Sequence, residues 1–152
     1  MDDSLRELYQ EVILDHSRHP RHYGALAAAT HHGEGLNPLC GDQVRIYLIL
    51  DANDRIADIK FEGKGCAISQ ASASLMTDML KGRSVNEAEN LMQGFLHLVK
   101  GDAVNGELAA DDREILDVMA GVSAFPMRVK CATLAWHTMK SALEGGAAAK
   151  TE

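Results

Sequence analysis

The first twenty residues place apolar positions at the period of an α-helix. Ser4 and Glu7 form the Ser-x-x-Glu pattern of a capping box at a helix N-terminus. The apolar positions recur every three or four residues and so share one helical face: Leu5, Leu8, Tyr9, Val12 and Ile13. His19-Pro20 predicts the end of this helix, because a proline disfavours helical geometry in the residue before it.

A strict alternation of apolar and polar residues follows a less regular stretch. Residues 18–43 lack a sustained pattern, and we expect them to be irregular, with one short strand around residues 33–37. Residues 44–50 and 57–62 then alternate with period two on either side of a turn at residues 51–54. Each run has one apolar face, which predicts a β-hairpin whose sheet is covered by helices on one side only.

The second half of the chain returns to helical spacing. Helices are predicted from residue 66 to about 81, after a second capping box at Ser84 and Glu87, near residues 111–120, and from about 127 to 144. We therefore expect one α+β domain over residues 1–146, with a three-stranded antiparallel sheet and helices packed on one face. Residues 147–152 are predicted to form a disordered tail.

Composition narrows the class of protein. The 152 residues carry a net charge of −7, which argues against nucleic-acid binding because that needs a basic surface. No apolar run is long enough to span a bilayer, and the acidic start is unlike a signal peptide. These features predict a cytoplasmic protein that does not enter a membrane. The three cysteines, an odd number, favour metal or thiol chemistry over a disulfide framework.

The candidate chemistry lies in the three cysteines and one aspartate: Cys40, Asp42, Cys66 and Cys131. Three thiolates and a carboxylate are a complete ligand set for a tetrahedral metal, although their spacing is not that of a zinc finger. Cys40 precedes the hairpin and Cys66 follows it, so both are expected at the same end of the sheet. Cys131 joins them if the last helix begins at that end.

Charge near the cysteines supports a reactive role. Cys66 and Cys131 are each expected in the first turn of a helix, where the dipole favours a thiolate. Lys64, Arg128 and Lys130 add positive charge around the site. Two simpler interpretations remain open: free cysteines are often buried packing residues, and Asp42 suits a turn.

Four segments together resemble a known family, the U-type iron–sulfur cluster assembly proteins of the IscU and NifU N-terminal superfamily. The segments are Asp15-His16 with residues 20–24, residues 37–43, residues 63–74 and residues 128–136. Within this family the chain is most similar to the SufU branch. IscU-like scaffolds carry a histidine immediately before the third cysteine, where this chain has Lys130, and residues 83–122 resemble an insertion found in SufU-like proteins.

The resemblance implies a zinc ion bound by Cys40, Asp42, Cys66 and Cys131. It also implies that a SufS-type cysteine desulfurase donates persulfide sulfur to Cys40, after a histidine of the partner displaces Cys40 from zinc. The sulfur would then pass to cluster synthesis, with a SufBCD-type scaffold as a downstream partner. This would make the protein a sulfurtransferase-like acceptor and activator rather than a stand-alone enzyme.

Other functions remain open at this point. The same four side chains could hold a [2Fe–2S] cluster or iron, which would make the chain a scaffold. A structural zinc site is a third interpretation, although a fourth cysteine or a histidine would then be more natural than Asp42. An enzyme with a cysteine nucleophile would need a basic partner, and no histidine adjoins any cysteine.

Overall fold

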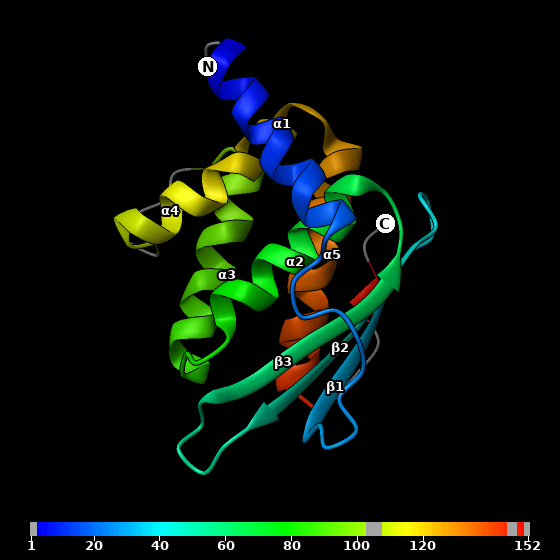
Figure 1. The fold of residues 1–152 in the computed structure, drawn as a ribbon, viewed down its shortest axis with the longest axis vertical. Helices are drawn as coiled ribbons and strands as arrows, with labels where there is room; N and C mark the ends of the chain where they lie inside the picture. Colours follow the sequence, from blue (N-terminus) through cyan, green and yellow to red (C-terminus); the bar gives the residue numbers. More distant parts are fainter. Residues whose placement is uncertain (1–2, 103–107, 146–148, 151–152) are drawn as a thin grey trace.

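Figure 1 shows the computed structural model, which describes residues 3–102, 108–145 and 149–150. The helices and strands are α1 (Asp3–Arg18), β1 (His31–Asn37), β2 (Asp42–Leu50), β3 (Ile56–Lys64), α2 (Ala67–Leu80), α3 (Val85–Lys100), α4 (Ala110–Leu116), the 3-10 helix η1 (Asp117–Ala124), α5 (Pro126–Leu143) and β4 (Ala149–Lys150). Apart from η1 and β4, which were not predicted, they follow the order expected from the residue pattern. Among the described residues, none of the helices combines the length and hydropathy that crossing a bilayer requires.

The sheet contains three long antiparallel strands with β2 in the centre. The hairpin register pairs Ile46 with Phe61 and Leu48 with Ile59, so their side chains share one face. Strand β1 pairs with β2 along seven residues, starting two residues earlier than predicted. The predicted α+β fold is confirmed. The two-residue strand β4 extends the sheet beside β1, in parallel. Disorder of the tail stays a prediction, because residues 146–148 and 151–152 lie outside the described part.

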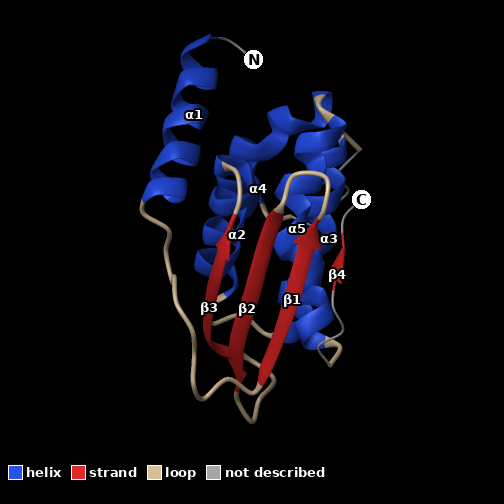
Figure 2. Cartoon of the chain, turned by 90° about the vertical axis from the view of Figure 1, so that its right-hand side faces the viewer, coloured by secondary structure: helices blue, strands red, loops and turns tan. Residues whose placement is uncertain are grey.

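One face of the sheet is covered by helices, and Figure 2 shows them behind the strands. Helix α5 crosses β1 and β2, while α2 packs beside α5 and against β3. The approach of α5 to β1 requires glycine, because a Cβ at Gly33 or Gly35 would collide with Thr138 of the helix. Apolar side chains fill the space between the layers, with fully buried members including Ile46, Leu48, Ile59, Phe61, Met76, Leu134 and Trp136.

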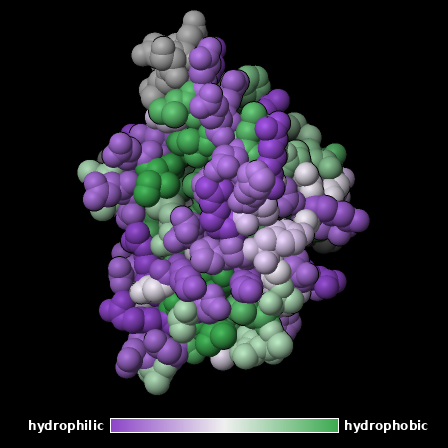
Figure 3. Space-filling model, in the orientation of Figure 1, coloured by the Kyte–Doolittle hydropathy of each residue, from purple (hydrophilic) through white to green (hydrophobic). Residues whose placement is uncertain are grey.

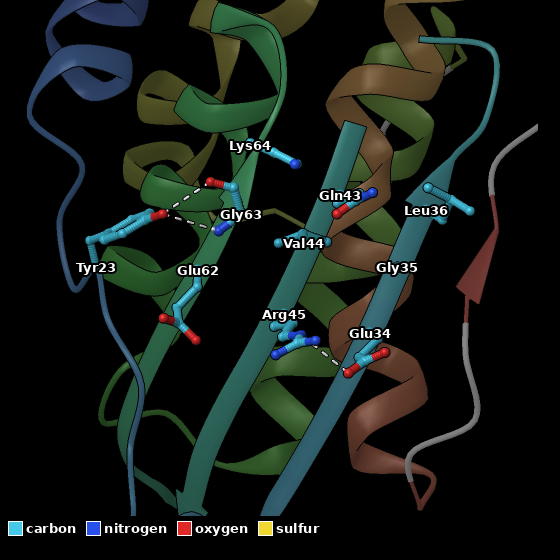
Figure 4. Close-up of a pocket in the computed structure, with 10 residues that line it drawn as sticks. All are labelled: Tyr23, Glu34, Gly35, Leu36, Gln43, Val44, Arg45, Glu62, Gly63 and Lys64. Atoms are coloured by element: carbon cyan, nitrogen blue, oxygen red, sulfur yellow. Dashed lines mark hydrogen bonds and ion pairs between the residues drawn. The ribbon is translucent and has the colours of Figure 1, made fainter. Parts of the chain in front are cut away.

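The opposite face of the sheet is polar and carries a shallow hollow. Figure 4 shows the hollow on β1, β2 and β3, with Tyr23 beside it. Arg45 on β2 pairs with Glu34 on β1 at 3.2 Å. The Tyr23 hydroxyl donates to the Gly63 carbonyl at 3.0 Å and accepts from the Gly63 N–H at 3.3 Å, which holds the outer edge of β3.

Helix α1 stands at the edge of the molecule and contacts α2. The structure describes it from Asp3 onward, and the predicted cap at Ser4 stays a prediction, because the Ser4 side chain lies outside the described part. Figure 3 shows apolar surface toward the α1 end of the molecule, and Leu8 and Leu14 are exposed large apolar residues of this helix. The capping box at Ser84 and Glu87 is confirmed at the start of α3.

His16 attaches α1 to α2 through a buried hydrogen bond. Its Nδ1 lies 2.8 Å from Ser74 Oγ, which also accepts from the Arg21 N–H at 2.8 Å. The hydroxyl proton of Ser74 is therefore available to a neutral His16. Burial, and then the charge of Arg21, lower the pKa of His16, whereas Asp15 and Asp78 oppose this shift.

The stability of the metal-free protein is expected to fall as the pH drops below about 6.5, the usual pKa of histidine in an unfolded chain. The unfolded state then binds a proton that folded His16 refuses until its lower pKa is reached, so acid favours unfolding by up to about 1.4 kcal/mol per pH unit. Urea unfolding between pH 5 and 7.5 should show a shallower pH slope for His16→Gln. The matched control is His32→Gln, at an exposed position on β1. An unchanged slope in His16→Gln would contradict the assignment.

Candidate metal centre

The four candidate ligands come from one end of the sheet. Cys40 lies in the turn between β1 and β2, and Asp42 is the first residue of β2. Cys66 is the N-cap of α2, directly after β3. Cys131 lies in α5, which begins at Pro126 beside these strand ends. The structure thus brings together residues that are far apart in the sequence.

The turn that carries Cys40 is built on the backbone of Asn37. The Asn37 carbonyl accepts from the N–H groups of Cys40 and Gly41, at 3.3 and 2.9 Å. Gly41 has a φ of 71°, a left-handed conformation that glycine adopts without strain. Cys40 is exposed at the tip of this turn. The local sequence therefore presents one thiol to solvent at the edge of the site.

Asp42 is fully buried and joins the two ends of the hairpin. Its Oδ1 accepts from the Cys66 N–H at 3.0 Å, and its Oδ2 lies 4.0 Å from Cys66 Sγ. Gly65 makes this contact possible, because a Cβ at that position would run into the Asp42 carboxylate. Asp42 is therefore more than a turn residue: it ties the start of β2 to the start of α2.

The distances between ligand atoms fit a shared cation. The Sγ atoms of Cys40 and Cys131 are 3.7 Å apart. Two thiolates bound tetrahedrally to zinc at about 2.3 Å lie about 3.8 Å from each other. Ligand atoms of Cys40, Asp42 and Cys131 all lie within 4.8 Å of one another. Three of the four predicted ligands thus form a compact group.

Cys66 lies at the edge of this group. Its Sγ accepts from the Ser69 N–H at 3.4 Å, which caps the N-terminus of α2, at the helix start where the sequence placed Cys66. The thiol also remains beside Asp42, as described above. Cys66 is thus the ligand candidate with a second, helix-capping task.

Cys131 has a different environment from the one predicted. It lies in the second turn of α5 rather than the first and is only 5% exposed. Burial raises the pKa of its thiol strongly, and the neighbouring Asp42 and Cys66 raise it further. The expectation that a helix N-terminus favours a Cys131 thiolate is therefore wrong. A bound divalent cation would oppose this shift, because its positive charge stabilises the deprotonated Cys131 thiolate.

The three basic residues predicted to surround the site lie on its flanking elements. Lys64 is exposed at the end of β3, and Lys130 is half-buried in α5. The Arg128 guanidinium lies 5.6 Å from the centre of the Phe125 ring, in a cation–π contact. Their electrostatic role at the site stays a prediction.

Two residues with structural tasks at the site were not assigned from the sequence. Asn37 is fully buried beside the thiols, and Gly65 provides room for Asp42. A signal for Asn37 was present, because asparagine before a proline is typical of a turn that the side chain stabilises. No local signal identifies Gly65, because its neighbour Asp42 comes from another strand.

The match to a family model agrees with this architecture. Residues 8–96 match the NifU-like N-terminal domain, and this segment includes Cys40, Asp42 and Cys66. The chain belongs to this family, whose named relatives include iron–sulfur cluster assembly proteins. The resemblance inferred from the four sequence segments is confirmed.

Two similar relatives carry different functional names. The zinc-dependent sulfurtransferase SufU of Bacillus subtilis (strain 168) is 41% identical over 146 residues, covering 94% of this chain and 96% of that protein. The iron–sulfur cluster assembly scaffold protein IscU of Streptococcus pyogenes serotype M1 is 40% identical over 149 residues, covering 96% of this chain and 89% of that protein.

Solved structures share the fold. A crystal structure described as a proposed iron–sulfur cluster assembly scaffold protein for the SUF system, from Fervidobacterium islandicum AW-1, is 36% identical with a TM-score of 0.78. It covers 91% of this chain and 98% of that chain. A crystal structure of a hypothetical protein is 40% identical with a TM-score of 0.81, with the same coverage.

Proposed function

We propose that this protein is a zinc-dependent acceptor of persulfide sulfur in iron–sulfur cluster assembly, with Cys40 as the accepting residue. The observation that carries the proposal is the position of Cys40, an exposed residue whose Sγ lies 3.7 Å from the Sγ of the buried Cys131. A cysteine that accepts sulfur must bind the metal at this site and must also be accessible to a partner protein. The similarity to a zinc-dependent sulfurtransferase supports the same function.

The metal would be held by Cys40, Asp42, Cys66 and Cys131. Bound zinc would keep the cysteines deprotonated without redox chemistry of its own, which suits a site that handles sulfane sulfur. The buried Asp42 and Cys131 would form the fixed side of the site. Cys40 could detach from the metal by a side-chain rotation, because the residue is exposed.

Sulfur transfer at Cys40 needs no oxidant. The Cys40 thiolate attacks the terminal sulfur of a cysteine persulfide, R–S–S–H, on the donor protein. The S–S bond of the donor breaks, the donor cysteine leaves as a thiolate, and Cys40 becomes Cys40–S–S–H. The proton stays on the transferred sulfur, and the total charge is unchanged.

The surface around Cys40 supports contact with a protein donor, which we propose is a SufS-type cysteine desulfurase. Leu39 is next to Cys40 in the sequence, and Phe125 and Met127 lie at the start of the helix that carries Cys131. These three apolar residues are exposed, with exposed fractions of 58, 56 and 46%. Aromatic residues, methionine and arginine are enriched at protein interfaces, and Phe125, Met127 and the exposed Arg128 are of these types. A SufBCD-type scaffold would receive the sulfur next. We place this exchange in the cytoplasm, where thiols stay reduced.

A scaffold for a [2Fe–2S] cluster is the second candidate function, since the similar Streptococcus protein is named as a scaffold. The same four side chains would hold the cluster irons. Lys130 stands in this chain where IscU-like scaffolds carry histidine, which favours the sulfur acceptor. A purely structural zinc site is disfavoured, because such a site gains nothing from an exposed ligand such as Cys40.

One experiment separates these functions. Zinc content is measured first, and desulfurase turnover is then followed with zinc-loaded protein, metal-stripped protein and Cys40→Ala. We expect one zinc per chain, stimulation by the zinc-loaded form only, and turnover at the basal rate with Cys40→Ala. Mass spectrometry should find one added sulfur atom on the Cys40 peptide. Stimulation that survives Cys40→Ala would refute the acceptor role, and a stable cluster after anaerobic reconstitution without stimulation would support the scaffold.

A further inference from the structure

Asn37 is a buried polar residue at the point where β1 ends and the site begins. Its exposed fraction is 0%, the same as that of Asp42. Asparagine is mostly found at the surface, and a buried amide is costly unless hydrogen bonds satisfy its donor and its acceptor. At Asn37 both are used: the donor's partner is the candidate ligand Cys131, and the acceptor's partner is Leu39 in the turn that carries Cys40.

The contacts of Asn37 reach three of the four candidate ligands. Its side-chain Nδ2 donates to Cys131 Sγ at 4.0 Å, a long hydrogen bond to sulfur. Its Oδ1 accepts from the Leu39 N–H at 3.3 Å, and its carbonyl accepts from the Cys40 N–H, so side chain and backbone both shape the Cys40 turn. In the β1–β2 ladder Asn37 is the direct partner of Asp42.

We propose that Asn37 is a positioning residue that sets the metal affinity of the site by fixing Cys131 and the Cys40 turn relative to each other. The N–H donor holds Cys131 Sγ in place and stabilises the charge that the sulfur carries as a ligand. The acceptor holds the turn but leaves the Cys40 side chain free. Asn37 therefore makes the two sulfurs unequal: Cys131 is anchored and Cys40 can exchange.

This inference rests on the metal-binding part of the proposed function and is independent of sulfur transfer. Partners of metal ligands typically contribute ten- to hundredfold in affinity. Two substitutions separate the two hydrogen bonds of the side chain. Asn37→Asp keeps an oxygen acceptor for the Leu39 N–H and loses the N–H donor to Cys131. Asn37→Leu has a similar size and loses both.

The test measures zinc and cobalt(II) affinity by competition with a chelator, and the thiolate-to-cobalt charge-transfer bands. Both variants are expected to bind each metal about ten- to hundredfold more weakly than the unaltered protein, with shifted bands. Asn53→Asp adds the same charge at the exposed hairpin tip, at the other end of the sheet, and should change neither. Native affinity and bands in Asn37→Asp, with weak binding only in Asn37→Leu, would overturn the proposal and leave Asn37 as a turn residue.

A measurement on the unaltered protein keeps the inference testable if both variants misfold. The ¹⁵N side-chain amide signals of Asn37 should shift, and their hydrogen exchange should slow, when zinc is added. Amide signals that do not respond would overturn the proposal. These experiments contain no desulfurase, so their outcome does not depend on sulfur transfer. Loss of sulfur acceptance in the desulfurase assay, with metal affinity retained, would count against the proposed function alone.

Discussion

Replacing Cys131 with alanine is expected to weaken zinc binding by roughly a thousandfold. Structural zinc sites bind with apparent free energies of about 10–16 kcal/mol, so each of four ligands contributes roughly 3–4 kcal/mol, or two to three powers of ten. Cys131 should lie at the upper end, because the residue is only 5% exposed and its sulfur lies 3.7 Å from that of Cys40. Water can replace an exposed ligand more easily than a buried one.

Competition with a chelator measures this loss, and the unfolding of the metal-free protein shows whether the fold persists. Thr133→Val is the matched control, because Thr133 is buried in the same helix and its hydroxyl donates to the nearby Lys130 carbonyl. It should bind zinc like the unaltered protein. Cys131→Ala that retains zinc affinity to within tenfold would show that Cys131 is not a ligand.

Gly65→Ala is the second change with a large expected effect. The new Cβ would collide with the Asp42 carboxylate, which is fully buried and accepts from the Cys66 N–H. Overpacking of this kind costs about 1–3 kcal/mol of unfolding free energy. Either the carboxylate or the start of α2 must move, and both carry candidate ligands. We therefore expect lower stability together with weaker zinc binding.

The fluorescence of Trp136 reports the unfolding, because it is the only tryptophan and stacks on Phe95 in the core with ring centres 4.2 Å apart. Gly121→Ala is the control, since a Cβ at Gly121 would meet no atom within 4 Å. It should leave the urea midpoint and zinc affinity nearly unchanged. A Gly65→Ala protein as stable as the Gly121→Ala protein would contradict the close contact described here.

The hairpin shows why much of the fold was predictable. Period-two alternation places Ile46 and Phe61 on the same face, and a short turn leaves only antiparallel pairing. The helices of the second half were located by spacing and by a cap such as Ser84. The β1 strand was found only in part, because its glycines, Gly33 and Gly35, lack strand propensity and are needed by α5.

The predictions that failed concern the environment of Cys131 and the helix expected over residues 111–120. Both depend on the residue at which a helix starts and on the elements that pack against it. A start at Pro126 moves Cys131 into the second turn of α5, away from the helix N-terminus, and into a buried position beside Asp42. The 3-10 helix η1, where a continuous acidic helix was expected over residues 111–120, likewise reflects packing against α3. Local patterns carry little information on such boundaries.

By itself, the sequence determined the order of helices and strands, the one-sided sheet and the chemical nature of the candidate ligands. Periodicity and side-chain chemistry are local properties, which the chain carries before it folds. Only the tertiary structure decided that Cys131 is buried while Cys40 is exposed, and that Asn37 touches both sides of the site. These features depend on contacts between residues distant in sequence, because a hydrogen bond or a burial exists only once α5 has packed across the sheet.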